Sequence, residues 1–372
     1  MTQEVVDERS ESTNSSGVEM IIDTDVHERL GASEDLLPYM DEAWRRYITE
    51  FAFKGVSSIR GGSPYGLTGG DRLDWSEEDG PAGTSVEALR RHLFDDLEES
   101  VVILNGLFHM SALTAQFEFA SALARAYNDW QVDKWLSRES RLRGSVHVIA
   151  NDPIGAAKEI DRIAENPQIV QVFLPIMIDR QYGDPFYDPI YKAAARNDLA
   201  VAFHHGPATR TAFGYPRYFA EWHSLAAPLG AMNQLTSLVF NGTLDKFDGL
   251  KFVFLEASIG WLPWALKRLD ENSREFRDEV PWVKRLPSES VIENVRMSTQ
   301  PMGEIRPRDL SSIVDQVGSD RVFMFSSDYP HYDGDNPTKA FPTSLSQDLR
   351  DRVFYKNALE TYPRLGSEFG RA

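Results

Sequence analysis

The chain has 372 residues, and acidic residues outnumber basic ones by 57 to 39, which gives a formal net charge of −18. This charge disfavours nucleic acid or an anionic membrane surface as a partner, because both would repel the protein. Hydrophobic residues make up 42% of the chain, enough for a large packed core, and cysteine is absent. Disulfides and cysteine-based metal sites are therefore excluded, so any metal must be held by His, Asp and Glu.

The beginning of the chain carries no recognisable targeting signal. Residues 1–18 are polar and acidic, which predicts a disordered tail ahead of a single domain over residues 19–372. No stretch approaches the ~18 uninterrupted apolar residues that a membrane helix needs. We therefore expect a cytoplasmic protein. Residues 52–90 are rich in Gly, Pro and acids and predict a long loop or lid inserted into the domain.

Short apolar segments alternate with helical patterns along the rest of the chain. The predicted strands are 20–27, 100–104, 144–150, 169–174, 199–203, 251–255 and 321–325. The predicted helices are 113–136, one that starts at Pro153 behind the N-cap Asp152, one opened by Asp188 and Pro189, 225–247, 260–277 and 345–361. About eight strand–helix units favour a closed, parallel (β/α)8 TIM barrel over an open doubly wound sheet.

Three predicted strands end in residues of metal-ligand type. The first ends in Asp25 and His27, the strand near residue 200 ends in His204 followed by His205, and the last is followed by Asp328. The carboxyl ends of barrel strands meet on the face that holds the active site. Imidazole and carboxylate donors suit divalent Zn, Mn or Fe. We therefore predict a metal site, with one ion or two, that acts on a small-molecule substrate.

The alternation of side chains along a strand refines this prediction. Asp25 and His27 are two residues apart, so both point to one side, which Asp23 shares one step deeper. His205 points away from His204 if the strand continues that far, which makes a structural role for His205 as plausible as a functional one.

Four segments resemble one family of metal enzymes: Ile22–His27, Val201–His204, Phe252–Pro263 and Phe325–His331. They are similar to the amidohydrolase-related enzymes, specifically the branch of aminocarboxymuconate-semialdehyde decarboxylase and the resorcylate-type decarboxylases. The resemblance implies a distorted (β/α)8 barrel with a divalent metal, and a homodimer or higher oligomer.

The resemblance also assigns roles to individual residues. Asp25 and His27 stand where the family has His-x-His or Glu-x-His, and His204 matches the histidine after the middle strand. Asp328 matches the aspartate that sits at the metal in the family and serves in proton transfer.

Glu256 departs from the family pattern, because the decarboxylases carry a histidine near this point. Together with Asp25 and Asp328 it would bring three carboxylates to a site with two imidazoles, and one 2+ ion would leave excess negative charge in a buried pocket. Glu256 is then a protonated general acid, a partner of Arg210 or Arg217, or a ligand of a second metal ion. A salt bridge or a helix N-cap is the structural alternative.

Other polar and aromatic side chains are weaker candidates. His223 precedes a predicted helix and is a candidate acid, base or extra ligand, and His331 is expected to hydrogen-bond Asp328 or to cap its loop. Three further histidines are assigned structural roles: His109 in a loop, His147 in barrel packing and His92 on an exposed helix. Three tryptophans are candidate walls of a substrate pocket or core residues: Trp75, Trp222 and Trp261.

Three hypotheses follow for the function. The first is a metal-dependent lyase or hydrolase on a small aromatic or unsaturated carboxylic acid, with non-oxidative decarboxylation favoured by the resemblance and Asp328, His223 and Glu256 as catalytic residues. The second is a dinuclear Fe or Mn oxygenase with Glu256 as a ligand. The third is a non-catalytic barrel subunit of a hetero-oligomer.

Overall fold

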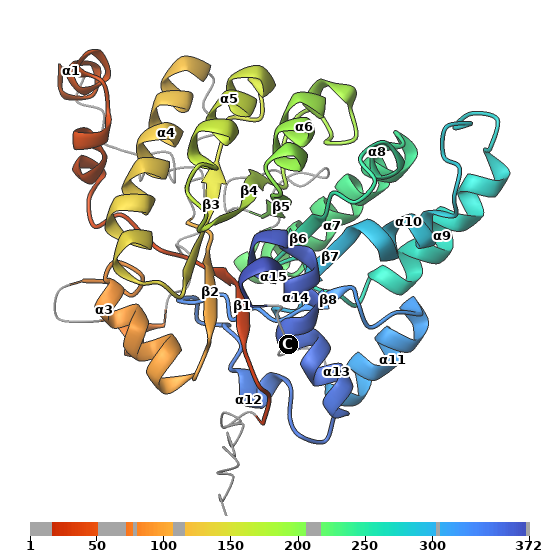
Figure 1. The fold of residues 1–372 in the computed structure, drawn as a ribbon. Coiled ribbons are helices and arrows are strands. Elements are labelled where there is room, and N and C mark those ends of the chain that lie inside the picture. The colour runs from red at the N-terminus through yellow and green to blue at the C-terminus, as the bar shows by residue number, and fades with distance from the viewer. Residues whose placement is uncertain are drawn as a thin grey trace, which may run out of the picture.

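The computed structural model of the protein describes residues 17–50, 72–76, 80–106, 116–205, 217–302 and 306–369. Eight parallel strands form one sheet in the order of the chain (Figure 1). The strands are β1 (Ile22–Val26), β2 (Val101–Leu104), β3 (Leu142–His147), β4 (Ile169–Pro175), β5 (Ala200–His204), β6 (Phe252–Leu255), β7 (Val295–Ser298) and β8 (Phe323–Met324).

The two edges of this sheet approach each other and nearly close a barrel. The Thr24 backbone N–H donates to the Phe325 carbonyl at 3.1 Å, and the Asp328 N–H donates to the Asp25 carbonyl at 3.0 Å. A parallel bridge joins Val26 to Tyr329. The predicted (β/α)8 barrel is therefore confirmed, and its seam lies between the first and the last strand.

Helices surround the strands, and Figure 1 shows α4, α5 and α6 side by side on the outside of the barrel. The helices are α1 (Glu42–Glu50), α3 (Val86–Leu89), α4 (Phe117–Lys134), α5 (Pro153–Ile163), α6 (Asp188–Arg196), α7 (Phe219–Phe240), α8 (Thr243–Lys246), α9 (Leu262–Glu275), α10 (Pro287–Asn294), α11 (Pro307–Val317), α12 (Pro337–Ala340), α13 (Gln347–Asp351), α14 (Asn357–Thr361) and α15 (Pro363–Phe369). Short 3-10 helices cover Ser33–Tyr39, Leu73–Trp75, Leu136–Arg138 and Pro185–Tyr187, and π-helical segments cover Arg90–Asp96 and Arg352–Lys356.

Local sequence signals set several of these boundaries. The Asp152 side chain accepts a hydrogen bond from the Gly155 N–H, as expected of an N-cap, and α5 begins at Pro153. The helix predicted over 225–247 begins six residues earlier and is divided at Gly242, whose φ of 70° lies in the left-handed region that favours glycine. Helix α10 and strand β7 were not predicted. The four residues of β7 have mixed polarity and give no clear strand pattern.

The predicted tail and loop agree with the structure only in part. Residues 1–16 of the predicted tail lie outside the described residues, whereas Val18 is buried in the core, so packed structure begins before residue 19. Of the predicted 52–90 loop, residues 52–71 and 77–79 lie outside the described residues. Its last part is helical, since α3 begins at Val86 behind the N-cap Ser85.

The C-terminal helices close the amino-terminal end of the barrel. Ala358, Tyr362 and Leu365 belong to the apolar cluster inside the barrel, together with residues at strand starts such as Val101 and Ala200. In Figure 1, α14 and α15 accordingly lie across the strands. The polar residues that follow the strands lie at the opposite, carboxyl-terminal end of the barrel.

The packing of this C-terminal plug is testable by shortening one of its side chains. Leu365→Ala removes a side chain that is fully buried, and such changes cost about 2–5 kcal/mol of unfolding free energy. Leu225→Ala on α7 is the matched control, because Leu225 is 51% exposed and its loss should cost less than about 0.5 kcal/mol. Chemical denaturation measures both, and equal effects would contradict the proposed plug.

Candidate metal centre

The carboxyl ends of β1, β5 and β8 bring four predicted ligands together. Asp25 lies within β1, His27 directly after it, His204 ends β5, and Asp328 follows β8. All four side chains are buried, and one donor atom from each lies within 4.8 Å of the others. Residues separated by some 300 positions in the chain thus offer donors to a common point.

The contacts within this group are short. His27 Nε2 lies 2.9 Å from Asp328 Oδ1 and 3.7 Å from Asp25 Oδ1. His204 Nε2 lies 3.4 Å from Asp25 Oδ2, and the two imidazole rings meet edge to face at 5.0 Å. Both rings therefore present Nε2 to the carboxylates.

The other nitrogen of each ring is held by the backbone. His27 Nδ1 donates to the Asn105 carbonyl at 2.7 Å, and His204 Nδ1 donates to the His205 carbonyl. This arrangement favours the tautomer in which Nε2 carries the lone pair that binds a metal. Asp25 Oδ2 and Asp328 Oδ2 are buried and accept no hydrogen bond from the described residues. The donor set fits a divalent cation.

The charges of the metal-free chain show what such a cation would replace. Burial lowers the pKa of His27 to about 4, so this imidazole is neutral. Burial acts in the same direction on His204, but Asp25 and Glu256 outweigh it and raise its pKa to about 10. Burial, followed by Glu256 and Asp25, raises the pKa of Asp328 well above its ordinary value. The proton on His204 thus neutralises charge that a 2+ ion would otherwise balance, and the raised pKa of Asp328 acts in the same direction.

Two of the carboxylates sit on unusual backbone. Asp328 has φ 59° and Glu256 has φ 46°, in the left-handed region that side chains other than glycine rarely adopt. Glu256 directly follows β6, and Asp328 lies four residues after the end of β8. The amide of each is held by a hydrogen bond: Asp328 N–H donates to the Asp25 carbonyl, and Glu256 N–H donates to Ser298 Oγ at 3.0 Å. Such positions concentrate at functional sites, where the surrounding structure enforces them.

Glu256 joins the predicted ligands to a second histidine group. Its Oε2 lies 3.1 Å from His204 Nε2, and its Oε1 lies 2.7 Å from His205 Nε2 and 4.0 Å from His223 Nε2. Burial would raise the pKa of Glu256, but the two neighbouring imidazoles hold it well below its ordinary value. Glu256 is therefore ionised in the metal-free chain.

Of the two predicted arginine partners of Glu256, the structure describes one, and it has another neighbour. Arg217 is exposed, and its guanidinium lies over the Tyr218 ring at 5.1 Å, while Arg210 lies outside the described residues. Among the described residues, histidines rather than an arginine contact the negative charge of Glu256.

His223 and Asp333 complete the outer group. His223 lies in the first turn of α7, which begins at Phe219, and not in a loop ahead of a helix as predicted. Its Nε2 is 3.4 Å from Asp333 Oδ2. Burial raises the pKa of Asp333, and the charge of Glu256 adds to this. Asp333 was not predicted as a site residue, although it follows Asp328 by only five residues.

Of two polar residues close to the centre, His331 contacts a predicted ligand through its side chain and Asp23 is held by backbone N–H groups. His331 Nδ1 lies 2.8 Å from Asp328 Oδ1, as predicted for a residue that supports this carboxyl. Asp23, in contrast, does not join the donor group. Its Oδ1 accepts from the Asp25 and Ser327 N–H groups instead, and the pairing of β1 with β2 shifts register between Asp23 and Val26.

The remaining histidines have structural surroundings. His147 is buried in β3 between Tyr127 and Phe173, as predicted. His92 is buried, with Nδ1 3.0 Å from the Tyr329 hydroxyl, so the prediction that it is exposed was wrong. The pattern misled because His92 lies on the inner face of its helix. His109 lies outside the described residues.

The three tryptophans lie on different sides of the site. Trp75 packs against Tyr329 at 4.9 Å between ring centres, and Trp222 packs against His205 at 5.4 Å. Trp261 donates from Nε1 to the Ala257 carbonyl. Trp75 and Trp222 are thus placed beside residues that follow β8 and β5.

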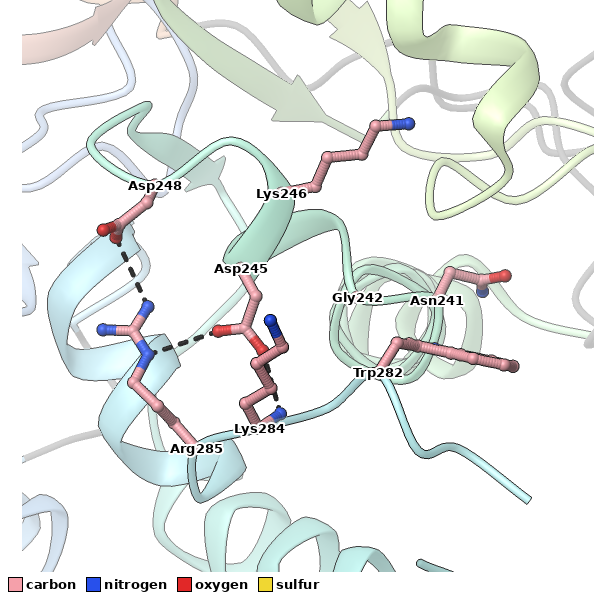
Figure 2. Close-up of a pocket in the computed structure, with 8 residues that line it drawn as sticks. All are labelled: Asn241, Gly242, Asp245, Lys246, Asp248, Trp282, Lys284 and Arg285. Carbon is pink, nitrogen blue, oxygen red and sulfur yellow. Dashed lines mark hydrogen bonds and ion pairs between the residues drawn. The ribbon is translucent and has the colours of Figure 1, made fainter. Parts of the chain in front are cut away.

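One hollow on the described surface is lined by none of these donors. It has a volume of about 520 Å³ and is lined by Asn241, Gly242, Asp245, Lys246, Asp248, Trp282, Lys284 and Arg285 (Figure 2). Asp248 precedes β6, so the hollow lies at the amino ends of the strands. Arg285 is already paired with Asp245 and Asp248, which leaves little free charge to bind a ligand.

The fold and the donor set define a metal-dependent enzyme on a (β/α)8 barrel. The family model described as amidohydrolase matches residues 22–364, and the chain belongs to this family. Among the described residues, no helix is both long enough and apolar enough to cross a membrane.

One relative is similar in sequence. Gamma-resorcylate decarboxylase from Polaromonas sp. (strain JS666 / ATCC BAA-500) is 25% identical over 258 residues, which span 64% of this chain and 76% of that protein.

Solved structures share the fold at lower identity. An amidohydrolase from Mycobacterium avium subsp. paratuberculosis K-10 has a TM-score of 0.71 at 19% identity, over 92% of this chain and 98% of that one. The 5-carboxyvanillate decarboxylase of Novosphingobium aromaticivorans DSM 12444, with bound manganese, has a TM-score of 0.69 at 19% identity, over 94% and 98%. The dihydroxybenzoic acid decarboxylase of Polaromonas sp. JS666, also with manganese, has a TM-score of 0.65 at 19% identity, over 95% and 98%.

The protonation of His204 leads to a prediction about metal binding. Because its pKa is about 10 in the metal-free chain, His204 carries a proton at neutral pH, and an ion must displace that proton to reach Nε2. Binding of Mn²⁺ should therefore release protons. The affinity for Mn²⁺ should fall by about tenfold for each unit by which the pH is lowered, for each proton released.

Calorimetry in two buffers of different ionisation enthalpy measures this release. His204→Gln is the matched variant, because it should bind the ion more weakly and release fewer protons. An affinity that stays constant between about pH 6 and about pH 8 would contradict the assignment of His204.

Proposed function

We propose that the protein catalyses the non-oxidative decarboxylation of a hydroxylated aromatic carboxylic acid at a single divalent metal ion. The supporting observation is the buried meeting point of Asp25, His27, His204 and Asp328 at the carboxyl ends of the barrel strands. The relatives named above as decarboxylases act on resorcylate, carboxyvanillate and dihydroxybenzoate, and two of their structures hold manganese. We infer the same substrate class and metal here.

The chain's residues divide the work as follows. Asp25, His27 and His204 hold the ion, with Asp328 beside it. A bound divalent ion supplies positive charge that stabilises negative charge developing on the substrate's oxygen atoms. Asp328 carries the proton that the reaction needs, and His331, whose Nδ1 lies 2.8 Å from Asp328 Oδ1, positions this carboxyl.

The proposed reaction balances without an oxidant. The proton of the Asp328 carboxyl moves to the ring carbon that bears the substrate carboxylate, and the bond from that carbon to the carboxylate breaks. The electron pair of the broken bond becomes the new C–H bond, and CO2 leaves. Asp328 then regains a proton from solvent. Glu256 and His223, at the edge of the group, are proposed to orient the substrate and to help return this proton.

Activity measurements test this proposal directly. The Mn²⁺-loaded protein should release CO2 from 2,6-dihydroxybenzoate or 5-carboxyvanillate, and the metal-free protein should not. Asp328→Asn should lower kcat by about 10²–10⁴, because the amide cannot carry the proton.

The matched control for this variant is Asp152→Asn. Asp152 also follows a barrel strand, and Asn is an equally good N-cap, so its activity should stay within about twofold of the original protein. Full activity of Asp328→Asn, or no CO2 release from any hydroxybenzoate by the metal-loaded protein, would rule out the proposal.

A second candidate function rests on the two oxygens of Glu256. One contacts His204 and the other contacts His205, which supports Glu256 as a residue that would help to hold a second metal ion. A second group of donors, His27, Glu256, Asp328 and His331, also meets within 4.8 Å. A dinuclear iron or manganese oxygenase would use this arrangement, with dioxygen and an external electron donor as co-reactants.

Metal content separates the two candidates. Elemental analysis should find one equivalent of metal per chain for the decarboxylase and two equivalents of iron or manganese for the oxygenase. Glu256→Gln adds a matched test, because it keeps the shape but removes the charge. Loss of one equivalent would identify Glu256 as a ligand, and a fall in activity at unchanged metal content would identify an acid–base or orienting role. If neither changed, Glu256 would have no part in either function.

Three expectations about the protein's context accompany the proposal. We expect a cytoplasmic location and a homodimer or higher oligomer, with the hetero-oligomeric, non-catalytic barrel as the alternative that metal analysis would separate. The 52–90 segment stays a predicted loop or lid. The N–H of its described residue Arg72 donates to the Pro330 carbonyl at 2.9 Å, so this residue lies beside the loop that carries Asp328.

A further inference from the structure

A column of buried polar side chains crosses the otherwise apolar interior of the barrel. Tyr362, between α14 and α15, lies at one end, and Gln171 of β4, Ser145 of β3 and Asn105 after β2 continue it toward the metal centre. Each of these four residues is fully buried. Burying so many polar groups is costly unless each is hydrogen-bonded, which makes the column a feature that requires an explanation.

The hydrogen bonds of the column all run in one direction. The Tyr362 hydroxyl donates to Gln171 Oε1 at 3.1 Å, and Gln171 Nε2 donates to Asn105 Oδ1 at 2.7 Å. Asn105 Nδ2 then donates to Asp25 Oδ1 at 3.0 Å. Ser145 supports the middle, since its hydroxyl accepts from Gln171 and donates to Asn105. In every link, the donor lies on the side of Tyr362 and the acceptor lies on the side of the predicted ligand Asp25.

The groups at the two ends fit this direction, since the Tyr362 phenol donates at the far end and the Asp25 carboxyl accepts at the near end. Burial raises the pKa of Tyr362 further above its ordinary value, so the hydroxyl keeps its proton. An O–H that faces Gln171 selects the amide orientation in which Oε1 points to Tyr362 and Nε2 points to Asn105. That orientation in turn requires Asn105 to present Oδ1 to Gln171 and Nδ2 to Asp25.

Asn105 acts on a second ligand through its backbone. Its carbonyl accepts from His27 Nδ1 at 2.7 Å, which leaves Nε2 of that ring for the ion. Its own N–H donates to the Val26 carbonyl at 2.7 Å, and its side chain also donates to the Thr24 carbonyl. One residue is therefore fastened to β1 on both sides of Asp25 and orients both donors of that strand.

We infer that Tyr362, Gln171 and Asn105 form a positioning relay that sets the orientation of Asp25 and His27 and so tunes the affinity of the metal centre from the opposite end of the barrel. The inference depends on the metal centre of the proposed function but not on its substrate. A relay with only a packing role would have no need of a uniform donor direction, since apolar side chains of similar volume would fill the same space.

Metal affinity of paired variants tests the relay. Tyr362→Phe removes only the hydroxyl, and Gln171→Glu replaces the donating amide with an acceptor of the same shape. Removing an outer hydrogen-bond partner of a metal ligand typically costs about 10–100-fold in affinity. We expect Gln171→Glu to weaken Mn²⁺ binding by about tenfold or more, and Tyr362→Phe, one step further away, by about threefold to tenfold.

Tyr191→Phe is the matched control. Tyr191 is also buried, and its hydroxyl donates to the Tyr182 carbonyl at 2.6 Å, outside the column. Both tyrosine variants should lose similar thermal stability without metal, but only Tyr362→Phe should bind Mn²⁺ more weakly and change its electron paramagnetic resonance spectrum.

The outcomes separate this inference from the proposed function. Unchanged Mn²⁺ affinity and spectrum in folded Tyr362→Phe would overturn the relay, whether or not Gln171→Glu folds. Equal weakening in Tyr362→Phe and Tyr191→Phe would also overturn it, because the effect would then follow stability alone. If the original chain binds Mn²⁺ but releases no CO2, the proposed function fails while the relay stands.

Discussion

The structure depends on one electrostatic constraint, the burial of several carboxylates within a few ångströms of one another at the end of a barrel. Like charges in a low-dielectric interior must be neutralised, and in the metal-free chain a proton on His204 does part of this, while burial and the neighbouring carboxylates raise the pKa of Asp328. A single divalent ion would neutralise the charge of the same carboxylates. The preference for a cation at this point follows from the fold itself, since the barrel seam forces Asp25 and Asp328 together.

The seam is also where fold and site become inseparable. The hydrogen bond from the Asp328 N–H to the Asp25 carbonyl joins the last strand to the first, and it places two predicted ligands side by side. Asp23, although not a ligand, accepts from the Ser327 N–H and so strengthens the same joint. The contact that closes the barrel therefore also brings the donors together. The column of buried polar side chains that ends at Asn105 holds Asp25 in this position.

Sequence patterns predicted most of the fold but not all of the site. Apolar strands and N-caps such as Asp152 identified the barrel, because these signals are local. The polar residues at strand ends identified the predicted ligands, because a parallel barrel gathers such ends on one face. Asn105 and Gln171 were not singled out, although a glutamine inside the apolar strand at 169–174 was a visible signal. The exposure of His92 was predicted wrongly, because periodicity does not show which face of a short helix meets a partner.

By itself the sequence determined the class of fold, the residue types available for a metal and the strand ends on which they would lie, since these follow from periodicity and composition. Only the tertiary structure decided which donors share a point. The Asp25 and Ser327 N–H groups hold the Asp23 carboxyl outside the donor group. The contacts of Glu256 with His204 and His205 keep this side chain negatively charged, which no local pattern specifies. Both outcomes depend on distances between residues far apart in the chain, and such distances exist only once the barrel has closed.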